Sequence, residues 1–151
     1  MAQIRPFQGL LYNTKKIKNP SRVVAPPYDV ISEKMRNELY RSDKYNIVRL
    51  ILNKECQGRK EHKYVYVRRL LDSWVSGGIL TRDVKPCLYI CAEEYRIDKV
   101  TKTRYGFFAR VKLEDFDNKK VLPHEHIIDA PMKDRLDLLR QARANLSPVF
   151  S

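Results

Sequence analysis

Apolar residues at helical spacing between Lys60 and Val75 constrain the fold most, because a helix with one apolar face must pack against other parts of the chain. The repeat consists of Tyr64, Val67, Leu70, Leu71, Trp74 and Val75. Gly77 and Gly78 follow and provide a helix end. The pattern predicts an amphipathic core helix. Trp74 is expected to pack inside rather than stack on a nucleic-acid base, since base stacking needs exposed rings.

Several segments have the alternation or β-branched content of strands. Residues Cys87 to Ile97 and Arg104 to Phe116, joined by a turn at Asp98 to Thr103, predict an antiparallel hairpin. The apolar segments Pro6 to Tyr12 and Tyr45 to Leu52 predict a first strand and a buried strand. With the helices, these strands indicate an α+β fold that has a small mixed sheet and three or four helices.

The hairpin carries a glycine and two cysteines with structural interpretations. Gly106, inside the second strand, indicates a bulge or a close backbone approach. Cys87 and Cys91 would share one strand face, but their spacing lacks the short loop of a zinc knuckle, so we expect core cysteines. With Cys56, the chain has three cysteines. An odd number of cysteines in a chain without an export signal favours reduced thiols.

The first residues of two further helices can be identified from their capping residues. Ser32 is a suitable N-cap for a short helix from Glu33 to Tyr40. Asp129 is a suitable N-cap for the last helix, with Pro131 in its first turn and Asp134 near the positive end of its dipole. The last helix has two adjoining rows that should pack: Leu136, Leu139 and Arg143, and Leu138, Ala142 and Leu146.

Length and composition bound the class of protein. The 151 residues fit a single domain, 1–151, and the apolar fraction of 43% and charged fraction of 32% are typical of a globular protein. No run approaches the roughly 18 apolar residues of a membrane helix, and the polar amino terminus does not read as a signal peptide. We therefore expect a cytoplasmic protein with no membrane partner.

The net charge of +12 is unevenly distributed. Residues Met1 to Val75 contain 16 basic and 7 acidic residues, a net +9, whereas Ser76 to Ser151 have 14 and 11, a net +3. A nucleic-acid surface is one interpretation, and a solvated basic face or a missing acidic partner segment is the other. No helix-turn-helix, zinc-finger or RNA-recognition motif supports the first.

Two places before the suspected site hold polar groups that could serve a ligand. Consecutive prolines in VVAPPYDV exclude both a regular helix and a central strand, so a rigid extended turn would present Tyr28 and Asp29. The other interpretation is a structural corner with Asp29 capping a turn. Arg49, inside an apolar segment, needs a partner, which is either a structural ion pair or an anion in the same cleft.

The most reactive side chains gather between Val121 and Phe150. His124, Glu125 and His126 follow a short apolar strand and a proline, just before the last helix. Histidine and carboxylate together can bind metal, move protons or hold a phosphate, and a loop before a helix N-terminus favours anions. In the alternative structural interpretation, the histidines bond loop carbonyls while Asp134 and Arg135 form an exposed pair.

Five blocks resemble, in this order, one known family. They are RPFQGLLYN at Arg5, APPYDVIS at Ala25, YNIVRLIL at Tyr45, RYGFFARVKLEDF at Arg104 and PHEHIIDAPMKDRLDLLRQARANLSPVF at Pro123. They are similar to the amino-terminal part of the uncharacterised prokaryotic proteins catalogued as domain of unknown function 1015. Members are usually much longer, so the resemblance implies an amino-terminal fragment or a truncated member.

That family has been linked to a superfamily of ParB-like partitioning proteins, sulfiredoxin and an ADP-dependent kinase of free serine. The resemblance implies a small α+β domain, ParB/sulfiredoxin-like, whose loop and helix N-terminus bind nucleotide phosphates. It transfers catalytic roles to His124, Glu125 and His126. Ligand-binding roles pass to Asp134, Arg135, Tyr28 and Asp29. Two further candidates join them from the residues themselves: Lys133, which could substitute for a family lysine missing at Met132, and Arg49, which could face an anion in the same cleft. The chain departs from the family pattern at Ile127, where Thr is common, and at Met132, where Lys is common.

Three functions follow as hypotheses, and the residues leave open whether the protein is an enzyme. The first is binding of a small phosphorylated ligand or nucleotide (ADP, ATP or CTP with Mg²⁺), with phosphoryl transfer in which Glu125 deprotonates the acceptor. The second is a metal-dependent hydrolase using His124 and His126, with a third ligand from Asp29, Asp129 or elsewhere. The third is a non-enzymatic module that binds nucleic acid or protein.

Overall fold

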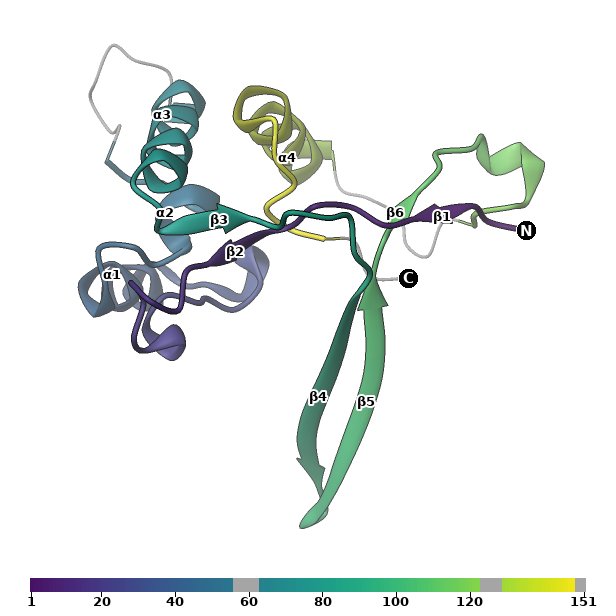
Figure 1. The fold of residues 1–151 in the computed structure, drawn as a ribbon, viewed down its shortest axis with the longest axis horizontal. Helices are drawn as coiled ribbons and strands as arrows, with labels where there is room; N and C mark the ends of the chain where they lie inside the picture. The colour runs from purple at the N-terminus through teal and green to yellow at the C-terminus, as the bar shows by residue number, and fades with distance from the viewer. Residues whose placement is uncertain (56–62, 123–128, 149–151) are drawn as a thin grey trace. The chain divides into compact units, whose positions relative to one another are not determined.

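The computed structural model describes residues 1–55, 63–122 and 129–148 of the chain. Contacts divide the chain into two compact units. The hairpin unit consists of Met1–Leu10 and Arg82–His126, and the helical unit of Leu11–Thr81 and Ile127–Ser151. Figure 1 labels the elements of both. The helical unit is thus built from two separate stretches of sequence.

The hairpin unit contains two antiparallel strand pairs. Strand β1 (Ile4–Arg5) pairs with β6 (Arg110–Val111), and β4 (Tyr89–Ile97) pairs with β5 (Val100–Phe108) in a long two-stranded ribbon (Figure 1). Asp98 and Lys99 join the ribbon with φ angles of 48° and 67°, the left-handed pair that a two-residue hairpin turn requires. The 3-10 helix η3 (Phe116–Asn118) follows the strands. The predicted hairpin is confirmed, with a shorter turn than expected.

The interpretations of Gly106 and the hairpin cysteines are wrong. Gly106 lies opposite Cys91 in an uninterrupted register, and a Cβ added to it would meet nothing within 4 Å. It therefore marks neither a bulge nor a close approach. Cys87 is exposed and Cys91 half-buried, and both are free thiols. They are not in a core because both faces of this two-stranded ribbon remain largely uncovered.

The single strand expected from Pro6 to Tyr12 is interrupted. Strand β2 (Leu10–Tyr12) pairs with β3 (Leu80–Arg82), separately from β1. Between β1 and β2, the Gly9 N–H donates to Tyr89 Oη at 2.6 Å, so a side chain takes the place of a strand partner. A Cβ on Gly9 would lie 2.8 Å from that oxygen, which explains why glycine occupies this position.

The helical unit holds the hydrophobic core. Its helices are α1 (Glu33–Ser42), α2 (Val48–Ile51), α3 (Lys63–Ser76) and α4 (Asp129–Ala142), with the 3-10 helices η1 (Pro20–Arg22) and η2 (Tyr28–Val30). Among the described residues, every buried hydrophobic side chain belongs to this unit. The least exposed large ones are Val23, Val48, Leu50, Val67, Leu71, Trp74 and Leu138.

Helix α3 confirms the amphipathic prediction. Trp74 is only 3% exposed and packs edge-on against Tyr45, with ring centroids 5.7 Å apart. Gly78 ends the segment with a φ of 65°, where glycine avoids the cost of a Cβ. The expected cap of α1 is also present, since Ser32 Oγ accepts from the Met35 N–H.

Helix α4 packs against α3 through fewer residues than expected. Leu138 and Ala142 are buried, but Leu136 and Leu139 remain 39% and 45% exposed. One of the two predicted rows therefore packs, because α3 covers only one side of the helix.

The buried strand predicted from Tyr45 to Leu52 is wrong, because Asn46 turns the chain into α2. Its side chain is fully buried, and its amide donates to the carbonyls of Arg22 at 2.8 Å and Val24 at 2.9 Å. Its Oδ1 accepts from the Val48 N–H at 2.9 Å. A side chain that bonds the backbone two residues ahead favours a turn over an extended strand.

The α+β class and the number of helices are confirmed for the part of the chain that the structure describes. In place of one mixed sheet, those residues form three separate two-stranded pairs. None of their helices has the length and apolar character needed to cross a bilayer. The ParB/sulfiredoxin-like topology stays a prediction.

We predict that Asn46→Asp lowers the free energy of unfolding by about 3 kcal/mol, because a buried carboxylate would replace two N–H donors and face two carbonyls. The control is Asn145→Asp, an exposed site where, among the described residues, the side chain accepts from the Ser147 N–H and makes no other hydrogen bond. Urea denaturation followed by fluorescence of Trp74, the single tryptophan, measures both. Equal, small effects of the two substitutions would contradict this role of Asn46.

Candidate functional site

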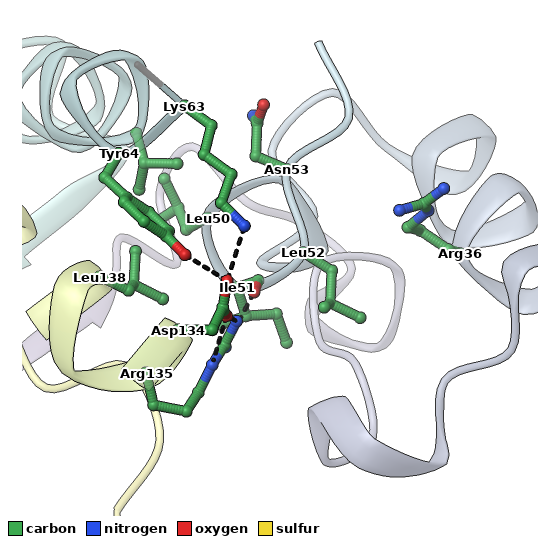
Figure 2. A pocket seen from close by; sticks show the side chains of 11 residues that line it. Arg36, Leu50, Ile51, Leu52, Asn53, Lys63, Tyr64, Asp134, Arg135 and Leu138 are labelled. Atoms are coloured by element: carbon green, nitrogen blue, oxygen red, sulfur yellow. Dashed lines mark hydrogen bonds and ion pairs between the residues drawn. The ribbon is translucent and has the colours of Figure 1, made fainter. Parts of the chain in front are cut away.

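A cavity of about 120 Å³ in the helical unit is the candidate site. Apolar side chains from α2, α3 and α4 form part of its wall, among them Leu50, Val67 and Leu138. Its charged lining consists of Arg36, Lys63, Asp134 and Arg135. Figure 2 shows Lys63, Tyr64 and Arg135 directed toward Asp134.

Asp134 is the acceptor on which these side chains converge. Lys63 Nζ donates to its Oδ1 at 2.6 Å, and Tyr64 Oη donates to the same oxygen. Arg135 donates to Oδ2 through Nε, at 3.1 Å, and through Nη2. The carboxylate thus joins the start of α3 to α4, across about 70 residues of sequence.

The pKa values of Asp134, Lys63 and Tyr64 are shifted in the directions that their hydrogen bonds require. Burial disfavours ionised Asp134, but hydrogen bonds from Lys63, Tyr64 and Arg135 outweigh it and hold the pKa of that carboxyl well below its usual value. Burial disfavours charged Lys63, but its hydrogen bonds to Asp134 and Tyr64 raise its pKa. Burial and the hydrogen bond to Asp134 raise the pKa of Tyr64. Near neutral pH, the cluster therefore contains a carboxylate, an ammonium and a neutral phenol.

Arg135 is held by three different kinds of contact. Besides Asp134, it donates through Nη1 to the Ile51 carbonyl at 2.9 Å. Its guanidinium carbon lies 4.5 Å from the centre of the Tyr28 ring. The turn after the paired prolines, the end of α2 and helix α4 all meet at this one side chain.

Arg36 lines the same cavity from α1 but stays outside the Asp134 cluster, and Figure 2 shows it well apart. Among the described residues, it pairs with Glu33 at 3.9 Å, which is a weak pairing. Its Nε is buried with no hydrogen-bond partner in the described part of the chain. Arg36 therefore keeps donor capacity that the fold leaves unused.

The structure brings together some of the residues named from the sequence. Asp134, Arg135 and Tyr28 lie in one cluster. Lys133 and Asp29 are exposed, and within the described residues neither side chain makes a hydrogen bond or ion pair. We therefore find no contact that attaches these two side chains to the cavity.

Arg49 has a separate set of partners. It forms an ion pair with Glu55 and donates to the Tyr40 carbonyl at 2.8 Å, with its guanidinium carbon 4.3 Å from the Tyr40 ring centre. Of the two interpretations, these contacts favour the structural ion pair. Arg49 is not among the described residues that line the cavity.

The loop that carries the proposed catalytic residues, His124, Glu125 and His126, lies outside the described residues. The strand expected before it, at Val121 and Leu122, is absent, since neither of these described residues is in a strand. Within the described ranges, no group of three or more histidine, cysteine, aspartate or glutamate residues is placed to hold a metal ion.

Sequence reasoning missed Lys63 and Tyr64 as site residues. Tyr64 was expected only as an apolar member of the α3 repeat, and its ring is indeed buried. Its hydroxyl and the Lys63 ammonium become site groups only because α4 packs against α3. No local pattern marks such a contact.

The family comparison agrees with the resemblance seen in the sequence. A family model described as "Protein of unknown function (DUF1015)" matches residues 4–151. The chain belongs to this family. No curated protein and no solved structure matches it. The family assigns no activity, and the link to ParB, sulfiredoxin and the serine kinase stays a prediction.

The arrangement is suited to holding an anion rather than to removing a proton. Asp134 is a weak base because its pKa is lowered, and three residues already donate to it. Lys63, Arg135 and Arg36 outnumber the one carboxylate in the charged lining. A small anion is therefore the complementary ligand in charge.

We predict that Asp134→Asn lowers the free energy of unfolding by about 2 kcal/mol near neutral pH, since charged donors lose their acceptor. Because the folded-state pKa is lowered, ionised Asp134 stabilises the fold above about pH 4, the range of an unfolded aspartate, and this is lost as the pH falls further. The difference from the unsubstituted protein should therefore shrink below about pH 4.

Urea denaturation over a pH series measures this effect. Asp137→Asn is the matched control, because it removes the same charge from α4 and the described residues show no ion pair to it. A difference for Asp134→Asn that stays constant with pH would show that its ionisation does not stabilise the fold.

Proposed function

We propose that the cavity binds the phosphate group of a small phosphorylated ligand or nucleotide. The observation that carries the proposal is that Lys63 and Arg135, from two helices, are fixed beside each other by one carboxylate. Holding cations in place before the ligand arrives reduces the entropy lost on binding. Arg36, with its unpartnered Nε at the same cavity, adds a third cation.

Arg135 and Lys63 have N–H donors that their contacts within the protein do not use. The Arg135 guanidinium carries five N–H groups, and its bonds to Asp134 and the Ile51 carbonyl use Nε and one hydrogen on each Nη atom. The Lys63 ammonium has three N–H groups, and its side chain is 48% exposed. Both can therefore donate to a phosphate oxygen while they keep their contacts to Asp134.

The size of the cavity limits which part of a ligand enters. Its volume of about 120 Å³ is below the roughly 300–1,000 Å³ of pockets that enclose whole drug-sized ligands. A phosphate group fits this space, but a complete nucleotide does not. A bound ADP, ATP or CTP would therefore place its terminal phosphate in the cavity and its base outside.

Phosphoryl transfer is a further step of the proposal. It requires Mg²⁺ and a group that orients or deprotonates the acceptor, and Asp134 is poorly suited to the second role. Glu125, His124 and His126 remain the candidates for catalysis, as the family resemblance implies. Binding and turnover are therefore separate claims that need separate measurements.

Isothermal titration with inorganic phosphate, ADP, ATP and CTP in Mg²⁺ tests the binding proposal. We predict that Lys63→Gln weakens binding by about tenfold, because it removes one charge-assisted hydrogen bond. Arg140→Gln is the control, since it removes one positive charge from the last turn of α4, and Arg140 does not line the cavity.

Lys63→Gln and Arg140→Gln should unfold at similar denaturant concentrations if the comparison is to report on binding. Absence of heat with every ligand, in a protein shown to be folded, would overturn the proposal. Equal weakening by both substitutions would show that only overall charge matters.

A further inference from the structure

The helical unit has a second concave region, a groove of about 520 Å³, which shares no lining residue with the cavity. The loop between β2 and η1 lines one part of it, and the end of α1 with the following turn lines another. Five basic residues face the groove: Lys16, Lys18, Arg22, Arg41 and Lys44.

Hydrogen bonds fix the two parts of the groove to each other. Ser42 Oγ donates to the Arg22 carbonyl at 2.9 Å, and Arg22 Nη2 donates back to the Ser42 carbonyl. Tyr12 Oη donates to the Tyr45 carbonyl at 2.7 Å, which holds the turn after α1 against β2. These hydrogen bonds hold the two sides of the groove together within one folded unit, so the groove is not a gap between independent loops.

Ion pairs within the described residues do not neutralise the basic side chains of the groove. Its one carboxylate, Asp43, already accepts from the Tyr45 N–H at 2.8 Å. None of the five basic side chains forms an ion pair within the described residues, although Arg36, Arg49, Lys63, Arg68 and Arg135 of the same unit all do. Lys16 and Arg22 bond only backbone carbonyls. These five cations without an ion pair thus lie together at the groove, whereas others of the unit, such as Lys133 and Arg140, do not line it.

Burial at the groove indicates the kind of partner. Protein interfaces usually centre on exposed aromatic or aliphatic anchors, but Ile17, the aliphatic residue of the lining, is 6% exposed. The Tyr45 ring packs edge-on against Trp74, and Lys44 Nζ lies 5.0 Å from its centre. Tyr45 is therefore unavailable as a platform for an unpaired base.

We propose that this groove binds the phosphodiester backbone of double-stranded nucleic acid, independently of sequence. Charge and N–H donors, without apolar anchors or stacking rings, are what phosphate recognition requires. A duplex has a higher density of phosphates than a single strand and gains most from a cluster of fixed cations. This activity is distinct from phosphate binding in the cavity.

Fluorescence anisotropy with a labelled duplex of about 20 base pairs, titrated at several salt concentrations between about 50 and 200 mM, tests the proposal. We expect a dissociation constant on the order of 10⁻⁴–10⁻⁶ M near physiological salt, with tighter binding at low salt. Duplexes of unrelated sequence should bind alike, and a single strand of the same sequence should bind more weakly.

The decisive comparison uses two double variants with equal loss of charge. Arg41→Gln with Lys44→Gln removes two groove cations, which are exposed on the surface. Arg140→Gln with Lys85→Gln removes one arginine and one lysine elsewhere. The groove variant should lose at least about tenfold in affinity, and its log–log salt slope should become shallower by about 2, while the control stays within about twofold.

Each of the following three outcomes would overturn the proposal. Equal losses in the two variants would mean that overall charge alone attracts the duplex. Tighter binding of a polyglutamate peptide than of the duplex at the same salt would assign the groove to an acidic protein segment. Failure of the unsubstituted, folded protein to bind the duplex would exclude this function while leaving the phosphate cavity unaffected.

Discussion

The arrangement of the helical unit depends on the buried amide of Asn46. Its donors satisfy the carbonyls of Arg22 and Val24, and its acceptor satisfies the first turn of α2. The hydrogen bond to the Arg22 carbonyl positions the segment that lines the basic groove. The hydrogen bond from the Val48 N–H directs α2 so that the Ile51 carbonyl meets Arg135. A single uncharged residue therefore determines the geometry around both proposed binding regions, because a buried amide can satisfy three backbone groups at once.

The two regions differ in how their positive charges are held. In the cavity, Lys63 and Arg135 are paired with Asp134, which fixes their positions but cancels part of their charge. In the groove, Lys16 and Arg22 bond neutral carbonyls, so their positions are fixed and their charge is retained. The first arrangement suits one small ligand in a defined orientation. The second suits a long polyanion, for which total charge matters more than the direction of each bond.

Predictions from the sequence succeeded where the signal was local. The repeat in α3, the Ser32 cap and the hairpin depend on neighbouring residues, and all three are present. The strand expected at Tyr45 to Leu52 failed because the fold of α2 depends on carbonyls more than 20 residues away. In the same way, Asp134, Arg135 and Tyr28 could be named from their motifs, whereas Lys63 and Tyr64 join them only through a contact across about 70 residues. The assignments of His124, Glu125 and His126 remain predictions.

The discontinuity of the helical unit has a consequence for how the chain folds. Helix α4 must return to α3 across the intervening residues 82–126, which makes their contact a late and entropically costly loop closure. During synthesis, α1, α2 and α3 leave the ribosome well before α4 does. The side of α3 that packs against α4 then lacks its neighbour until residues 129–142 emerge. The nascent chain therefore passes through a stage with an uncovered apolar surface, at which aggregation or chaperone binding competes with folding.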